Sequence, residues 1–199
     1  MHTYMMKRPN FQQLYEIAEG QAGYFTASQA NAAGFSWERL SYYTSTGRFL
    51  RVQPGIYRLV QFPNSPHEDL FVHSLRIGPE AVVSHDSALY LHQLSDVLPG
   101  KTHIIMPRTA SRRRKGVRLH TNQLKPGEIT HREGLRVTTP ARTITDAAAS
   151  GTPEEQIRLA VQQAIQRGLT SKDELLSMAR RRGGKVLQIT QRALNREAG

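Results

Sequence analysis

The sequence contains no cysteine, so disulfide bonds and thiolate metal sites are excluded. It has no apolar run of about eighteen residues, the length at which a membrane-spanning helix is expected. The first ten residues lack the apolar segment of a secretory signal. Aromatic residues make up only 7% of the chain, and its 199 residues suffice for one large or two small domains with modest cores. These absences predict a cytoplasmic protein with no membrane contact.

Positive charge is what the chain has in excess. It carries 27 Lys and Arg against 16 Asp and Glu, a formal net charge of +11. This balance indicates a polyanionic partner such as nucleic acid. The charge is spread along the chain, with +3 in residues 1–62, +4 in 63–150 and +4 in 151–199. A generally basic soluble protein would have the same composition, so the positions of the arginines decide more than their number.

The N-terminal part has the clearest local pattern, which is three helices followed by a hairpin. Thr26 and Gln29 have the spacing of a capping box at the start of the second helix. Ser36 is placed to cap the third helix, and Gly34 supplies the turn between them. The expected elements are helices at 10–19, 26–33 and 36–46 and strands at 49–53 and 56–60. This order predicts a winged helix-turn-helix domain over residues 1–62, in which a helix fits the major groove and the hairpin reaches the flanking backbone.

We expect the third helix and the hairpin of this domain to contact duplex DNA. Arg39 would read bases, because arginine can bond guanine bidentately. Hydroxyl groups and arginines beside it would hold phosphates. The predicted DNA-binding residues are Ser36, Arg39, Tyr42, Thr44, Arg48, Arg51 and Arg58. Small three-helix units with a hairpin also serve as protein-binding modules, and this alternative stays open.

The remaining residues, 63–199, are expected to form a second domain after the turn-rich segment 62–66. Helices are expected at 67–77 and 84–94, and strands at 101–106, 117–121 and 135–137. From residue 140 onward the pattern is helical only. The predicted fold class is α+β, with an N-terminal winged helix-turn-helix and a mixed α/β C-terminal domain that ends in a helical segment over 140–199.

A strongly cationic loop lies between the strands expected at 101–106 and 117–121. Such a loop cannot pack inside a core, and phosphate would neutralise the mutual repulsion of its side chains. Four adjacent members therefore join the predicted DNA-binding residues: Arg112, Arg113, Arg114 and Lys115. RNA, an acidic protein surface or solvent would satisfy the same charges, so the partner of this loop stays open.

No motif predicts an enzyme. Among the eight histidines, His67 and His73 are six residues apart and His85 and His92 are seven apart, and no zinc signature accompanies either pair. His85 and Asp86 are adjacent, and neighbours on a helix point apart. The chain also lacks a nucleophile elbow, a Walker loop and a dinucleotide fingerprint. We therefore predict no catalytic residues, no bound metal and no cofactor.

Three segments resemble the AbiEi-type antitoxins of bacterial type IV toxin–antitoxin systems. GFSWERLSYYTSTGRFLRVQPGIYRL, residues 34–59, looks like the winged module of that family. SHDSALYLHQLSD, residues 84–96, looks like its central helix, and GLRVTTPARTITDAA, residues 134–148, like its strand-to-helix signature. The resemblance spans nearly the whole chain, and the segments follow the order of the family.

This resemblance implies a DNA-binding N-terminal domain and a C-terminal α/β domain required for antitoxin action. It implies that the protein represses its own operon by binding promoter repeats. It also implies opposition to a nucleotidyltransferase-type toxin without a stable complex between the two proteins. Some relatives with this front half carry a nuclease-like C-terminal domain, but this chain has no strand-borne Asp followed by a Glu-x-Lys pair.

The sequence thus leads us to expect a sequence-specific DNA-binding protein that acts as antitoxin and transcriptional autorepressor of a type IV toxin–antitoxin operon. One alternative is an RNA-associated basic protein that uses the 112–115 loop. Another is a DNA-binding regulator without antitoxin activity, and a metal-dependent nuclease is a third hypothesis. The operator sequence, the oligomeric state and the identity of the toxin are not encoded in any pattern we find.

Overall fold

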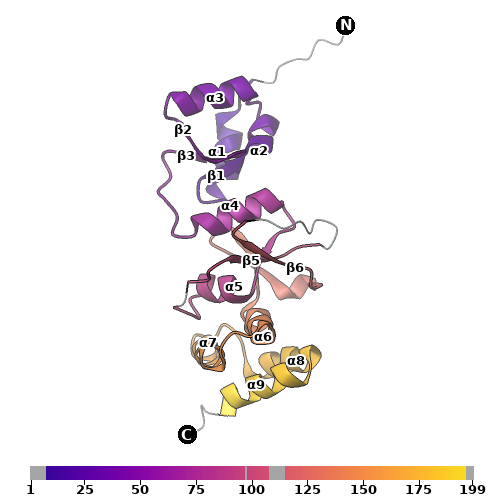
Figure 1. The fold of residues 1–199 in the computed structure, drawn as a ribbon. Helices are drawn as coiled ribbons and strands as arrows, with labels where there is room; N and C mark the ends of the chain where they lie inside the picture. Colours follow the sequence, from indigo (N-terminus) through magenta and orange to yellow (C-terminus); the bar gives the residue numbers. More distant parts are fainter. Residues whose placement is uncertain (1–7, 97, 108–114, 196–199) are drawn as a thin grey trace. The chain divides into compact units, whose positions relative to one another are not determined.

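The structure is a computed structural model that describes residues 8–96, 98–107 and 115–195 (Figure 1). Within these residues the chain is mixed α/β, with helices and two sheets. It divides into two compact units, the first reaching Pro79 and including Glu133–Leu135, and the second formed by Glu80–Arg132 and by Arg136 onward. The boundary expected after residue 62 falls inside the first unit. As the limit of an independently folding domain it stays a prediction.

The first unit contains four helices and a three-stranded sheet among its described residues. Its elements are α1 (Phe11–Glu19), β1 (Tyr24–Thr26), α2 (Ala27–Ala32), α3 (Trp37–Ser45), β2 (Phe49–Gln53), β3 (Ile56–Leu59) and α4 (Glu68–Ile77). The strand order is β1-β3-β2, with both pairings antiparallel. β3 is therefore the central strand. This arrangement is consistent with the expected winged helix-turn-helix.

Side-chain caps fix where these helices begin. The Thr26 hydroxyl accepts a hydrogen bond from the backbone N–H of Gln29 at 3.0 Å, and the Gln29 side chain accepts one from the Thr26 backbone at 2.8 Å. The predicted capping box is confirmed. Gly34 has φ of +86° between α2 and α3, a conformation that glycine adopts without steric cost. The two helices are thus held at a tight turn.

An aromatic core fixes α3 against the sheet. Phe35, Phe49 and Leu40 are buried, and Tyr43 packs on this cluster from α3. The ring centroids of Phe35 and Phe49 are 5.7 Å apart, and those of Tyr43 and Phe49 are 5.3 Å apart. Aromatic side chains bury much surface each. This core determines which face of α3 is left for solvent.

Among its described residues, the second unit has a five-stranded sheet followed by four helices. Its elements are β4 (Val82–Val83), α5 (His85–Leu91), β5 (Thr102–Ile105), β6 (Val117–His120), η2 (Pro126–Glu128), β7 (Ile129–Arg132), β8 (Leu135–Thr138), α6 (Pro140–Ser150), α7 (Glu154–Gln166), α8 (Lys172–Arg182) and α9 (Gly184–Asn195). The strand order is β6-β5-β4-β8-β7. The sequence predicted three of these strands and missed β4 and β7. β4 has only two residues, and β7 lacks alternating burial.

Helix α6 shares one apolar core with α7, α8 and α9 and lies on the side of these helices that is nearest to the sheet of the second unit (Figure 1). All its residues from Ala141 to Ala148 are buried, including the charged Arg142 and Asp146. The Arg142 guanidinium donates to Asp146 at 2.8 Å and also pairs with Glu128. From α8, Arg181 pairs with Glu128 and Arg182 with Asp146. The buried charges thus neutralise one another within the second unit.

No helix in the described part of the chain combines the length and the apolarity needed to cross a bilayer.

Candidate nucleic-acid interface

Helix α3 presents an exposed face that is largely uncharged. Trp37 and Tyr42 are each 60% exposed, and Ser41 and Ser45 also face solvent. Glu38 is the acidic residue of the first turn, and a hydrogen bond with the Ser36 side chain lowers the pKa of its carboxyl below the usual value. Glu38 is thus ionised at neutral pH. A carboxylate repels phosphate, and in the major groove it can accept a hydrogen bond from cytosine N4.

Ser36, Arg39 and Thr44, which were predicted to bind DNA, make hydrogen bonds at helix α3. The Ser36 hydroxyl accepts from the Arg39 backbone N–H at 3.4 Å, which makes it the N-cap of α3. The Thr44 hydroxyl donates to the Leu40 carbonyl at 2.7 Å. The half-buried Arg39 donates from Nη1 to the Gly34 carbonyl at 2.9 Å, across the turn before α3. These bonds support α3 itself, and contact of the three side chains with DNA stays a prediction.

Tyr42, Arg48 and Arg51 are exposed near the C-terminal end of α3 and on β2. Tyr42 packs edge-on against Tyr43 with ring centroids 5.2 Å apart. The Arg48 guanidinium carbon lies 5.8 Å from the centroid of the same Tyr43 ring. Tyr43 thus brings one predicted contact from the helix close to another from the loop before β2. Both side chains remain exposed to solvent.

Arg58 differs from the expectation of an exposed phosphate contact. It is 7% exposed, and its Nη1 donates to the Phe62 carbonyl at 2.9 Å. Its guanidinium carbon lies 5.9 Å from the centroid of the Tyr24 ring. The reason is the position of β3 at the centre of its sheet, because every residue of this strand is buried. We therefore remove Arg58 from the candidate interface.

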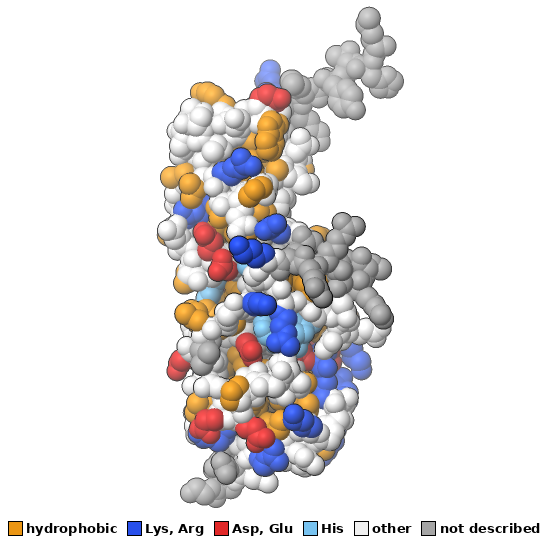
Figure 2. Space-filling view, viewed as in Figure 1, with side chains coloured by type: hydrophobic (Ala, Val, Ile, Leu, Met, Phe, Trp, Pro, Cys, Tyr) orange, Lys and Arg blue, Asp and Glu red, His pale blue; other side chains and the backbone are white. Residues whose placement is uncertain are grey.

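The cationic loop can be placed only in part. Arg112, Arg113 and Arg114 lie outside the described residues, and Lys115 is exposed just before β6 in the second unit. On the face seen in Figure 2, basic side chains are scattered among uncharged ones and do not gather in a single patch.

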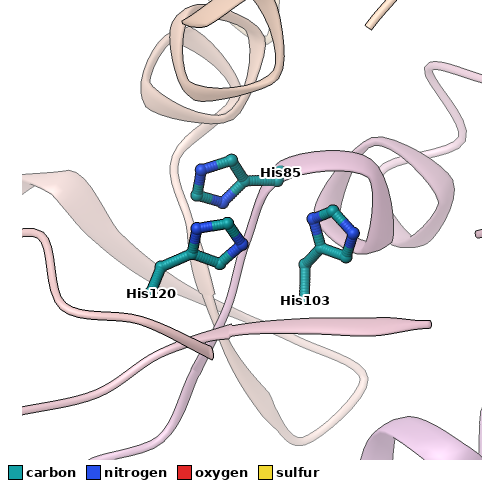
Figure 3. Close-up of side chains that lie close together, drawn as sticks. All are labelled: His85, His103 and His120. Carbon is teal, nitrogen blue, oxygen red and sulfur yellow. The ribbon is translucent and has the colours of Figure 1, made fainter. Parts of the chain in front are cut away.

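Three histidines that sequence reasoning set aside lie together in the second unit (Figure 3). His85 begins α5, His103 lies on β5 and His120 on β6, and one ring nitrogen from each lies within 4.8 Å of the others. The rings of His85 and His120 are stacked with centroids 3.6 Å apart. In the parallel pairing of the two strands, His103 is opposite Arg118 and Ile105 is opposite His120.

That register explains why the cluster was missed. Side chains two positions apart on a strand share a face, so the pairing puts His103 and His120 on the same side of the sheet. The sequence shows a histidine in each expected strand, but it does not show how the strands pair. In the sequence, His103 and His120 therefore stand as two separate histidines with no visible relation to each other.

Burial sets the protonation of these histidines. Burial, together with the neighbouring His120 and His103, lowers the pKa of His85 to about 2. Burial also lowers the pKa of His120 to about 4 and moves that of His103 below its usual value. A buried imidazole resists protonation because a charge loses its hydration there. All three rings are neutral at neutral pH.

Comparisons with known proteins give a family match for part of the chain and a similar fold for most of it. Among solved structures, the crystal structure of the RV2827C protein from Mycobacterium tuberculosis is similar, with a TM-score of 0.56 and 16% identity over 96% of this chain and 78% of that chain. At this identity the likeness concerns the fold alone. No match was found among curated proteins. Residues 12–60, which run from α1 through β3, match the family described as "Transcriptional regulator, AbiEi antitoxin", and this match confirms the resemblance for the N-terminal segment.

Proposed function

We propose that this protein is a DNA-binding antitoxin of the AbiEi type that represses transcription of its own operon in the cytoplasm. The observation that carries the proposal is the coincidence of the family match with one structural module. Residues 12–60 cover the helices α1 to α3 and the hairpin of β2 and β3. Such a module suits duplex DNA, because a helix fits the major groove and a hairpin can reach the adjacent backbone.

In this proposal the exposed face of α3 enters the major groove. Ser41, Tyr42 and Ser45 face solvent on this helix and offer hydroxyl groups to bases or phosphates. Glu38 would favour a cytosine amino group over phosphate. Arg39 stays a proposed base contact, supported by its position in the first turn of α3. A mixed set of donors and acceptors on one helix favours sequence reading over attraction to charge alone.

Arg48 and Arg51 would hold phosphates beside the groove. Arg48 stands after the end of α3 and Arg51 on β2, and both are exposed. The Tyr43 ring under Arg48 restricts its guanidinium, so less freedom is lost when a phosphate binds. Neutralising a phosphate releases condensed counterions, which makes each such contact dependent on salt.

The test uses fluorescence anisotropy with duplex DNA from the region upstream of the gene, at several salt concentrations. Arg48→Ala and Arg51→Ala should each weaken binding to all sequences alike and lower the salt slope by about one unit. Tyr42→Ala should weaken the upstream sequence more than random DNA. Arg180→Ala is the matched control, because Arg180 is an exposed arginine of the second unit. Wild-type affinity and salt slope in both arginine variants would refute the proposed interface.

Antitoxin action is the second part of the proposal, and it rests on the family match. We propose that the opposed toxin is of the nucleotidyltransferase type, encoded beside this gene, and that no stable complex forms. Co-expression with that neighbouring gene should restore growth for the wild-type chain. The Arg48→Ala/Arg51→Ala double variant should also restore growth if its fold is intact, because toxin neutralisation would not require repression. Growth arrest with every form of the chain would refute antitoxin action and favour the alternative of a DNA-binding regulator without antitoxin activity.

A further inference from the structure

The histidine cluster of the second unit contains polar atoms that the fold itself does not use. His103 is 5% exposed, and its Nδ1 is buried with no hydrogen-bond partner among the described residues. The Nε2 atom of His120 is in the same situation within the part of the chain that the structure describes. A buried polar atom without a partner destabilises the fold. Two such atoms within one cluster indicate that a ligand completes it.

The backbone at His85 supports this interpretation. Its φ is +51°, in the left-handed region that residues other than glycine rarely adopt. Such a conformation persists only where its surroundings enforce it, and it is found preferentially at functional sites. Here it places the His85 ring beside the rings of His103 and His120 (Figure 3). An ordinary first turn of α5 would not require it.

Hydrogen bonds hold the start of α5 on strand β5. The Ser84 backbone N–H donates to the His103 carbonyl at 3.0 Å, and the His103 backbone N–H donates to the Ser87 hydroxyl at 2.9 Å. The Ser84 hydroxyl also lies 2.9 Å from Nδ1 of His85. Two of the three imidazoles therefore come from backbones that are tied to each other. Preorganisation of this kind lowers the cost of ligand binding.

We propose that His85, His103 and His120 form a binding site for one divalent transition-metal ion, of which zinc is the best match. Imidazole nitrogen suits zinc, copper and nickel, whereas magnesium and calcium prefer oxygen ligands. Three protein ligands are typical of zinc sites that keep an open fourth position. The ion would link α5 to β5 and β6. Nothing in this site depends on the proposed DNA-binding function.

The present spacing is close to what zinc requires. Zn–N bonds of about 2.0–2.1 Å in a tetrahedron put the nitrogens roughly 3.4 Å apart. The three ring nitrogens lie within 4.8 Å of one another, so side-chain rotations of modest size would bring them to the ion. His85 and His120 would have to leave their stacked arrangement, because a metal binds in the plane of each ring.

The protonation state of the cluster suits a metal ion. The three rings are neutral at neutral pH, so the metal would not need to displace protons. The neighbouring Arg142 and Arg182 are paired with the carboxylates of Glu128 and Asp146, which offset their positive charge. Arg118 adds a positive charge beside His103 and His120, and Asp86 adds a negative one.

The test is a metal titration of the full chain, purified without a histidine tag and treated with a chelator. Co²⁺ is the optical probe, since bound tetrahedral Co²⁺ absorbs strongly in the visible range, and Zn²⁺ should displace it. We expect one ion per chain. His103→Gln and His120→Gln should each lower the affinity at least tenfold. His131→Gln is the matched control, because His131 is an exposed histidine on β7, and its affinity should equal that of the wild type.

Thermal unfolding gives a readout that needs no variant. A ligand that binds only the folded state raises the unfolding temperature, so Zn²⁺ should raise it and Mg²⁺ should not. Absence of both a stoichiometric Co²⁺ spectrum and a Zn²⁺-dependent shift would overturn the proposal. An equal loss of affinity in His131→Gln would overturn it too, because binding would then be non-specific. DNA binding is measured separately, so failure of one proposal leaves the other standing.

Discussion

Acid should destabilise the second unit through His85. This residue is 3% exposed, and burial lowers its pKa to about 2, whereas an unfolded chain has a histidine pKa of about 6.5. Between these two values the unfolded chain binds a proton that the folded chain does not. Stability must therefore fall as the pH falls below about 6.5, and this loss continues until the folded pKa is reached.

The size of the effect follows from the same two values. Each unit of pH below about 6.5 costs roughly 1.4 kcal/mol, so His85 alone accounts for about 2 kcal/mol between pH 7 and pH 5. His85→Asn removes the titrating group. Asparagine tolerates the left-handed backbone that His85 adopts, so the substitution adds little strain of its own.

The assay is urea denaturation followed by far-UV circular dichroism, with a chelator present, at pH 7 and pH 5. The wild type should lose about 2 kcal/mol more stability than His85→Asn over this interval. Titrating groups outside the histidine cluster occur in both proteins and cancel in the difference. Trp37 is the single tryptophan and belongs to the first unit, so its fluorescence reports unfolding of that unit. Between pH 7 and pH 5 this transition should shift by the same amount in the wild type and in His85→Asn. Equal losses in the circular dichroism transition would show that His85 does not titrate as its burial requires.

Two further predictions concern packing inside each unit. Arg142→Met should cost about 3–5 kcal/mol in urea denaturation, because it leaves buried carboxylates without their main partner, whereas Arg192→Met at an exposed ion pair should change stability little. Gly23→Ala should destabilise the first unit by about 1–3 kcal/mol more than Gly47→Ala in the same measurement. Both glycines have positive φ, so the backbone strain of an alanine is similar at the two positions. An added Cβ would lie 2.4 Å from Phe62 at Gly23, whereas at Gly47 it would meet nothing within 4 Å. Equal losses of stability in the two variants would show that the clash with Phe62 has no effect.

Features encoded by neighbouring residues could be predicted from the sequence. The capping box of Thr26 and Gln29, the Ser36 cap and the turn at Gly34 all depend on contacts within a few residues. They are enough to order the helices and the hairpin of the first unit. The family match then covers the same segment.

Features that depend on strand order could not be predicted. Arg58 stands in a sequence that alternates like an exposed hairpin strand, yet β3 becomes the central strand once β1 pairs with it. That pairing joins residues thirty or more positions apart, such as Tyr24 and Arg58. The histidine cluster has the same origin, because only the register of β5 and β6 places His103 beside His120.

The buried pairing of Arg142 and Asp146 indicates that the TPARTITD stretch, residues 139–146, has a structural role in the core of the second unit. These two charged residues are buried in α6, where Arg142 also pairs with Glu128 and Asp146 with Arg182. A genome search with this stretch as its query would therefore retrieve chains that share an architecture. It would not sort those chains by operator, by the toxin they oppose or by the ligand they hold.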